Sequence, residues 1–321
     1  MAVNVSDDPL TDPAQRSQLD RLLVRVAAHA PIRTAIVHPC DAVSLRGAME
    51  AARMQLIVPV LIGPAARIAA AAAQAGEDLT GIEIIATAHS HAAAEAACGL
   101  ARSGSVEAIM KGSLHTDELM AAAIDRDTGL RTDRRMSHVF VFDVPTYPRP
   151  LLISDAAVNI AHNLATKKDI VQNAIDCALA LGTVQPRVAI LAAVETVDPD
   201  MLATIDAAAL AKMADRGQII GGLVDGPLAF DNAISKTAAA MKQIVSPVAG
   251  VADVLIVPNI EAGNMIAKQL TYLANAQSAG IVMGARVPII LTSRADGLLS
   301  RLASCAVEVL VARHERSKPP R

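Results

Sequence analysis

Ser293, Arg294 and Asp296 follow a strongly apolar run and are the residues of this sequence best suited to chemistry. In VPIILTSRADGLLSRLAS (287–304) a buried strand is expected to end at Thr292, and Ser293 with Asp296 matches the capping box of a helix. The free N–H groups of a helix N-terminus favour an anion, and the planar guanidinium of Arg294 matches phosphate. The segment therefore predicts an anion site, although an ordinary cap followed by a surface arginine fits the same pattern.

Lys111 is a second candidate, in IMKGSLHTDELM (109–120). A strand is expected to end in its Lys-Gly pair, and a helix to begin after Thr116. Ligands of α/β sheets usually bind at the carboxyl ends of parallel strands, which is where Lys111 would lie. A solvated lysine at a strand end is the competing interpretation.

Polar residues also follow three other expected strands. They are Asp155 and Asn159 in SDAAVN, Asp225 in VDGP, and Asn259, Glu261 and Asn264 in VPNIEAGN. Each one alone fits a turn or a helix cap. Their repetition at strand ends favours a polar cleft with substrate-binding side chains.

Several familiar catalytic motifs are absent from the sequence. It has no G-x-x-x-x-G-K-[ST] loop, no G-x-G-x-x-G after the first strand, no H-E-x-x-H and no G-x-S-x-G. The eight histidines show no metal-ligand spacing, and the four cysteines form no C-x-x-C pair. Nucleotide hydrolysis, the usual nicotinamide chemistry and zinc catalysis are therefore disfavoured, and neither a metal nor a cofactor is expected.

The elements that must position these residues alternate between β-rich and Ala-rich segments. Strands are predicted at 34–38, 57–63, 82–87, 106–112, 138–144, 151–155, 188–194, 218–224, 253–258, 287–293 and 307–312, and helices at 41–54, 64–75, 91–102, 167–181 and 261–274. Alternation of this kind predicts an α/β fold with a doubly wound, mainly parallel sheet. The short proline-rich connection at 145–150 cannot hold a crossover helix, so it predicts a hairpin or a passage between domains.

Composition limits the class of partner. The 321 residues carry a net charge of -3 and are 52% hydrophobic but only 2% aromatic, which disfavours a nucleic-acid partner. The uncharged stretch 269–285 contains polar residues and falls short of the roughly 20 apolar residues that span a bilayer, so no membrane partner is expected. The N-terminus MAVNVSDDPLTDP does not read as a signal peptide, and a cytoplasmic location is expected.

Residues 109–312 resemble the phosphate acetyltransferase and phosphate butyryltransferase family. The matching phrases, in the family's order, are MKGSLHT, GLRTDRRMSHVFVFDV, SDAAVNIA, VDGPLAFDNAIS, SPVAGVADVLIVPNIEAGNMIAKQL and GARVPIILTSRAD. Two of them, VDGPLAFDNAIS and LTSRAD, look closer to the butyryl branch. This likeness implies that acyl groups of three or four carbons are accepted at least as well as acetyl.

The same resemblance implies a fold. It implies two doubly wound α/β domains with an inter-domain cleft, similar to the isocitrate and isopropylmalate dehydrogenases. Residues 1–150 and 285–321 would form the first domain, which carries the Ser-Arg segment, and 151–284 the second. Homodimerisation through the second domain is also implied.

The implied activity is transfer of a short acyl group between coenzyme A and inorganic phosphate, through a ternary complex. Coenzyme A, inorganic phosphate and acyl phosphate are then substrates, and no cofactor is needed. The family's serine-arginine pair maps onto Ser293 and Arg294. The aspartate that acts as the thiol base in the acetyl branch falls at Ser300, which leaves Asp296 as the substitute candidate.

A phosphate-binding arginine of the acetyl branch falls near Met120. Arg131, Arg134 and Arg135 are the nearby cations, and we predict Arg131 and Arg135 as substrate ligands.

Two other functions remain open. One is another enzyme on the same fold, such as a metal-dependent decarboxylating dehydrogenase. The other is a catalytically weak module that binds acyl-coenzyme A or belongs to a larger complex, which the missing aspartate at position 300 favours.

Overall fold

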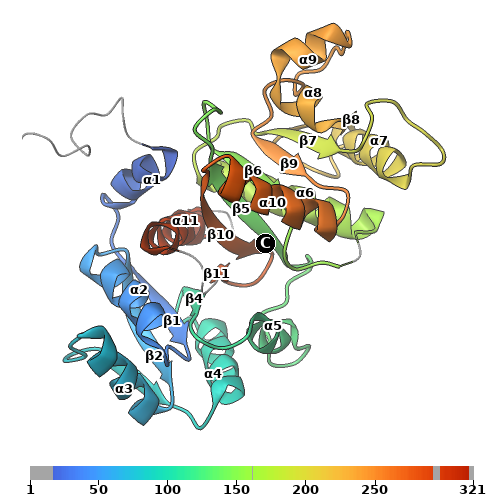
Figure 1. The fold of residues 1–321 in the computed structure, drawn as a ribbon. Helices are drawn as coiled ribbons and strands as arrows, with labels where there is room; N and C mark the ends of the chain where they lie inside the picture. The colour runs from blue at the N-terminus through green and yellow to red at the C-terminus, as the bar shows by residue number, and fades with distance from the viewer. Residues whose placement is uncertain (1–16, 161, 292–296, 318–321) are drawn as a thin grey trace, which may run out of the picture.

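The computed structural model describes residues 17–160, 162–291 and 297–317. In this part of the chain eleven strands form one continuous sheet, in the order β3-β2-β1-β4-β11-β10-β5-β6-β9-β7-β8 (Figure 1). The strands are β1 (Ile32–Val37), β2 (Ile57–Gly63), β3 (Glu83–Ala86), β4 (Ala108–Lys111), β5 (Ser137–Asp143), β6 (Leu151–Ser154), β7 (Arg187–Leu191), β8 (Leu223–Leu228), β9 (Val254–Ile256), β10 (Gln277–Met283) and β11 (Ile289–Ile290).

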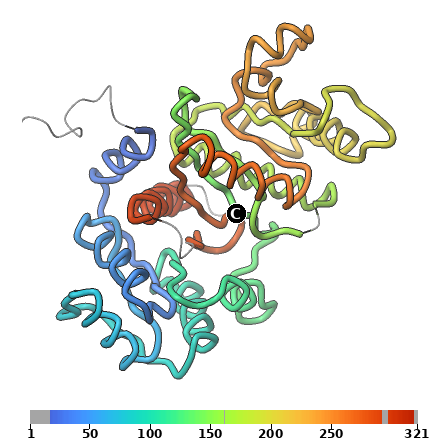
Figure 2. The backbone as a smooth tube through the Cα atoms, in the orientation of Figure 1, coloured from blue at the N-terminus to red at the C-terminus, as the bar shows by residue number. Residues whose placement is uncertain are grey.

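Helices cover both faces of this sheet. They are α1 (Gln18–Val26), α2 (Ala42–Arg53), α3 (Ala65–Ala75), α4 (Ser90–Arg102), α5 (Thr116–Ile124), α6 (Leu164–Ala180), α7 (Leu202–Asp215), α8 (Phe230–Ile234), α9 (Lys236–Met241), α10 (Ile260–Leu273) and α11 (Leu298–Ser317). One apolar core lies beneath α1, α2, α3, α6, α7 and α11. On the opposite face, α4 and α5 cover the first half of the sheet and α8 and α10 the second. The C-terminal α11 packs beside α1 and α2, as the tube view shows (Figure 2).

The sheet is mixed. Strands β3, β2, β1, β4 and β11 are parallel to one another, and so are β6, β9, β7 and β8. Between these groups, β10 is antiparallel to both β11 and β5, and β5 is antiparallel to β6. Three reversals separate the two parallel groups, so they run in opposite directions and their carboxyl ends lie at opposite edges of the sheet.

This arrangement corrects the predicted architecture. Two doubly wound domains of the isocitrate and isopropylmalate dehydrogenase type were expected, whereas the structure has one continuous mixed sheet. The hairpin β5–β6 supplies the physical reason. Its connection at 144–150 is too short for a crossover, so β6 returns antiparallel and the strands that follow it run in the reversed direction.

Most of the predicted elements are confirmed, among them β2, the β5–β6 hairpin and the helices α2, α3, α4, α6 and α10. The strand predicted at 307–312 is wrong, because these residues lie in α11. The strand at 218–224 is displaced to Leu223–Leu228, since Gly221 adopts a positive φ of 90° just before it. Strand β10 was not predicted at all; it pairs with β5 along its whole length.

Helix α11 is buried along residues 301–312 against β10, α1, α2 and α6. Despite its twenty residues, neither it nor any other described helix is long and apolar enough to cross a membrane.

Candidate functional site

A pocket of about 520 Å³ lies between the segment that leads into β5 and the segment that follows β6. Arg131, Arg134 and Arg135 line it from the first segment, and Asn159 from the second. Asp169, in the first turns of α6, completes the polar wall. Its volume falls in the range of about 300–1,000 Å³ that is typical of small-molecule sites. Arginine side chains suit an anionic ligand, and the carboxylates of Asp133 and Asp169 share the lining with them.

The arginine-bearing segment 131–136 is fixed by hydrogen bonds between side chains and backbone atoms. The backbone N–H of Arg135 donates to Oδ2 of Asp169 at 3.1 Å, and Nδ2 of Asn173 donates to the carbonyl oxygen of Arg135 at 2.9 Å. The hydroxyl of Thr132 donates to the carbonyl oxygen of Gly284 at 2.7 Å. The pocket wall is therefore anchored both to α6 and to the end of β10.

Asp155 supports the opposite wall from within the protein. Its side chain is fully buried, and Oδ1 accepts hydrogen bonds from the backbone N–H groups of Ala157 and Val158. Its Oδ2 accepts from the backbone N–H and from Nδ2 of Asn159, at 3.0 and 2.6 Å. Nδ2 of Asn159 also donates to the carbonyl oxygen of Met136 at 2.8 Å, so the two walls are joined directly. Asp155 is thus a support of the pocket, while Asn159 lines it.

His138, in β5, was not singled out from the sequence. Its ring is buried and packs edge-on against Phe140 with 4.3 Å between centroids. Burial lowers the pKa of His138 to about 4, although the charge of Asp155 acts in the opposite direction. Its Nδ1 has no hydrogen-bond partner among the described residues. His138 is therefore neutral at physiological pH, and no spacing in the sequence marks it.

Lys111 lies apart from this pocket wall, at the end of β4. It is buried, and its Nζ donates to the carbonyl oxygens of Gly112 and Leu114 at 3.3 and 3.1 Å. Ile290, the last residue of β11, pairs with Met110, so β11 ends next to the end of β4 that carries Lys111. The predicted catalytic residues Ser293, Arg294 and Asp296 come next in the chain and lie outside the described residues.

The remaining predicted residues do not line the arginine pocket. Asp225 lies within β8 and accepts a hydrogen bond from the N–H of Gly226 at 2.8 Å. Asn259 caps α10, and Glu261 is in the first turn of that helix. Asn264 reaches the segment after β6, where its Nδ2 donates to the carbonyl oxygen of Ala156 at 3.5 Å. We find no group of three His, Cys, Asp or Glu side chains suited to a metal ion in the described ranges.

The sequence of this chain is similar to those of known proteins along most of its length. Residues 88–307 match the sequence model of the phosphate acetyl/butaryl transferase family. A phosphate acetyltransferase from Rhizobium meliloti is 58% identical over 305 residues, which cover 95% of this chain and 96% of the relative. The chain belongs to the phosphate acetyl/butaryl transferase family. A phosphate butyryltransferase from Clostridium acetobutylicum is 37% identical, over 91% of this chain and 97% of the relative.

The structural comparison leads to the same family. A branched-chain phosphotransacylase from Enterococcus faecalis V583 superposes with a TM-score of 0.77 at 28% identity, covering 88% of this chain and 100% of the other. The fold is therefore that of the phosphotransacylases, and the expected isocitrate and isopropylmalate dehydrogenase-like fold is corrected accordingly. Members of the phosphate acetyl/butaryl transferase family are acyltransferases, and this chain is an enzyme of that class.

Proposed function

We propose that this phosphate acyltransferase moves a short acyl group between coenzyme A and inorganic phosphate, with acyl phosphate as the other product or substrate. The full-length match to a phosphate acetyltransferase at 58% identity carries the proposal. A pocket lined by three arginines is consistent with substrates that all bear phosphate groups.

The proposed catalytic residues are Ser293, Arg294 and Asp296, which follow β11 in the chain. Arg294 would hold the phosphoryl group, and Ser293 would donate to the oxyanion of the tetrahedral intermediate. One such donor is typically worth about 2.7–4 kcal/mol. A thiol with a pKa of about 8.5 is only slightly ionised at neutral pH, so Asp296 is proposed as the base. Binding both substrates together supplies the proximity, and no covalent acyl-enzyme is required.

Acetyl is the acyl group that we propose as preferred. The relative that is 58% identical is named an acetyltransferase, while the butyryltransferase is 37% identical. This comparison over nearly the whole chain outweighs the two phrases that favoured three- or four-carbon groups. Measuring kcat/KM for acetyl-, propionyl- and butyryl-coenzyme A tests the choice, and a tenfold preference for butyryl would reverse it.

A homodimer is proposed, with the contact on the second half of the chain. An apolar groove of about 450 Å³ lies between Phe230 and α10, and Tyr272 and Leu273 on that helix are largely exposed. Exposed apolar surface of this kind usually marks a protein interface. Light scattering should give twice the chain's mass of 33.3 kDa, and Leu273→Glu should give the mass of one chain. A monomeric wild-type protein would contradict the proposal.

The activity itself is tested by following thiol release from acetyl-coenzyme A with and without inorganic phosphate. Phosphate-dependent release with parallel formation of acetyl phosphate supports the proposal. A decarboxylating dehydrogenase would instead reduce a nicotinamide in the presence of a divalent metal. A binding module would bind coenzyme A without turnover.

A further inference from the structure

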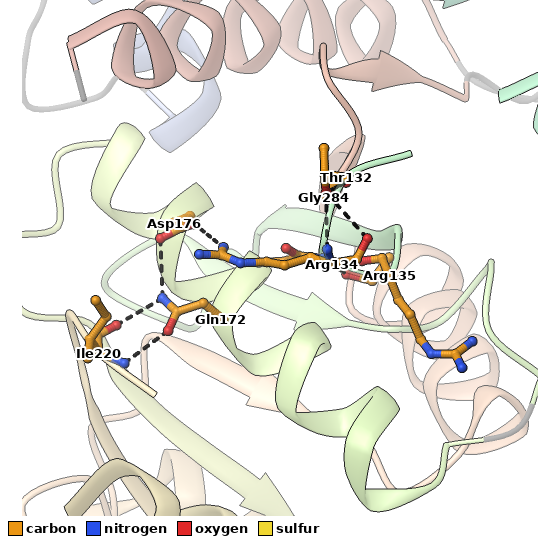
Figure 3. Close-up of polar contacts among 9 residues, drawn as sticks. Thr132, Arg134, Arg135, Gln172, Asp176, Ile220 and Gly284 are labelled. Atoms are coloured by element: carbon orange, nitrogen blue, oxygen red, sulfur yellow. Dashed lines mark hydrogen bonds and ion pairs between the residues drawn. The ribbon is translucent and has the colours of Figure 1, made fainter. Parts of the chain in front are cut away.

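Arg134 and Arg135 are adjacent in the chain, but their side chains point in opposite directions (Figure 3). Nη1 of Arg134 lies 2.6 Å from Oδ2 of Asp176, on α6, and this ion pair is largely shielded from solvent. The guanidinium of Arg135 points away from that pair and makes no hydrogen bond or ion pair with another described residue. The same holds for the guanidinium of Arg131 among the described residues, and all three arginines line the pocket.

The anchor of Arg134 continues beyond Asp176. Nε2 of Gln172, one turn earlier on α6, donates to Oδ1 of Asp176 at 3.3 Å and to the carbonyl oxygen of Ile220 at 2.9 Å. The backbone N–H of Ile220 donates back to Oε1 of Gln172 at 2.9 Å. Side chains of α6 thus tie the arginine segment to the loop that precedes β8 (Figure 3).

We propose that Arg134 is a positioning residue. Through its ion pair with Asp176 it holds segment 131–136 so that Arg131 and Arg135 present their guanidinium groups to a phosphate group in the pocket. This rests on the proposed function, in which inorganic phosphate, acyl phosphate and coenzyme A all supply that chemistry. The proposal also separates the ligands from the support: Arg131 and Arg135 bind the phosphate group, because the guanidinium of Arg134 is already paired with the carboxylate of Asp176.

Preorganisation is the physical reason for such a division. A free arginine side chain loses considerable rotamer freedom when it binds a ligand, and a mobile backbone would add to that loss. Asp169 holds the backbone N–H of Arg135, and Asn173 holds its carbonyl oxygen. The ion pair of Arg134 fixes the preceding residue, so binding of the anion need order only the side chains of Arg131 and Arg135.

The test uses Arg135→Ala, Arg134→Ala, Arg134→Lys and the double alanine variant in the full chain. Arg53→Ala is the matched control, because Arg53 is also ion-paired but lies on α2, with Glu50 and Glu77 as partners. Calorimetry measures binding of inorganic phosphate and of coenzyme A separately, and steady-state kinetics measures KM and kcat.

We expect Arg135→Ala to weaken the affinity for one of the two ligands by about tenfold or more. Arg134→Ala should weaken the same affinity by about three- to tenfold, and Arg134→Lys should recover most of it because the charge that faces Asp176 is kept. In the Arg135→Ala background, loss of Arg134 should weaken that affinity by a smaller factor than it does in the wild-type chain, since the part of its effect that acts through Arg135 is already lost and only the part through Arg131 remains. KM for that ligand should follow its affinity, with a smaller change in kcat.

The ligand that is affected identifies the source of the phosphate group. Weaker binding of inorganic phosphate alone assigns the pocket to phosphate and acyl phosphate, whereas weaker binding of coenzyme A alone assigns it to the phosphates of that molecule. Unchanged affinities in Arg135→Ala, or fully additive losses in the double variant, overturn the proposal. If the wild-type protein binds these ligands without acyl transfer, the proposed function fails while the binding measurements still decide the role of Arg134.

Discussion

Gly284 lies so close to Arg135 that a Cβ atom at position 284 would be 2.5 Å from the carbonyl oxygen of Arg135. It would also lie 2.8 Å from Nδ2 of Asn173, the group that donates to that oxygen. Gly284 has a φ of 86°, which glycine adopts at little cost, and its own carbonyl oxygen accepts from Thr132. The end of β10 and the arginine segment are therefore packed backbone to backbone.

Gly284→Ala should displace the arginine segment and weaken substrate binding in the pocket. The expected cost in stability is about 1–3 kcal/mol, from the positive φ and the close contact together. Gly81→Ala is the matched control, because Gly81 has a similar φ of 80° but a Cβ atom there would meet no other atom within 4 Å. Thermal unfolding and KM are measured for both. Equal losses of stability with unchanged KM in both variants would contradict the role of this contact.

Burial of His138 should make the protein less stable as the pH falls below neutrality. The unfolded chain takes up a proton near pH 6.5, whereas the folded protein does so only near its pKa of about 4. Between these values the unfolded state binds more protons, so the free energy of unfolding should decrease as the pH is lowered, by at most about 1.4 kcal/mol per pH unit. His138→Phe should flatten this slope, and His29→Gln, at an exposed position, should not. Parallel slopes for wild type and His138→Phe would refute the assignment.

Glu308 should have the opposite dependence on pH. It is fully buried in α11, its Oε1 has no partner among the described residues, and burial raises its pKa well above the usual range. The folded protein keeps this proton after the unfolded chain has lost it, so Glu308 should reduce stability as the pH rises above 4.5. Glu308→Gln should stabilise the protein at pH 8 by about 1–3 kcal/mol. The exposed Glu95→Gln serves as the control, and a destabilised Glu308→Gln at pH 8 would speak against a protonated carboxyl.

The elements of the fold that the sequence predicts are those marked by a short local pattern, such as an apolar run or closely spaced prolines. Strand β2 and the short connection between β5 and β6 follow directly from apolar runs and from proline spacing. Helix α11 did not, because it is buried along its middle and exposes no polar face to solvent there, so its VEVLVA stretch has the pattern of a buried strand. Strand β10 begins with polar residues, and it is a strand because it pairs with β5, a long-range contact that no local sequence pattern encodes.

Some of the predicted substrate-binding residues lie together in the structure, while their roles stay predictions. Arg131, Arg135 and Asn159 were predicted as ligands, and the structure brings them to one pocket. Asp225 lies instead in an edge strand. The carboxyl ends of the two parallel groups of strands lie at opposite edges of the sheet, so polar residues at strand ends do not all meet in one cleft, although the sequence analysis predicted that they would. The partner of Arg134 is 42 residues away on α6, and only the folded chain reveals that pair.

Arg294→Ala should raise KM for inorganic phosphate and for acyl phosphate far more than KM for coenzyme A. It should also lower kcat, because charge reorganises on the phosphoryl oxygens as the bond breaks. Arg294→Lys keeps the charge but loses the bidentate fork, so partial recovery is expected. Kinetic constants within about twofold of wild type, as expected for the surface control Arg53→Ala, would place the phosphate site elsewhere.

Transfer of phosphate itself is the most direct measurement of the central claim. The protein is incubated with acetyl-coenzyme A and radiolabelled inorganic phosphate, and thiol release and labelled acetyl phosphate are measured in the same samples. The account predicts one labelled acetyl phosphate for each thiol released, and no thiol release when phosphate is omitted. Release of thiol without labelled product would show hydrolysis of the thioester and contradict a phosphate acyltransferase.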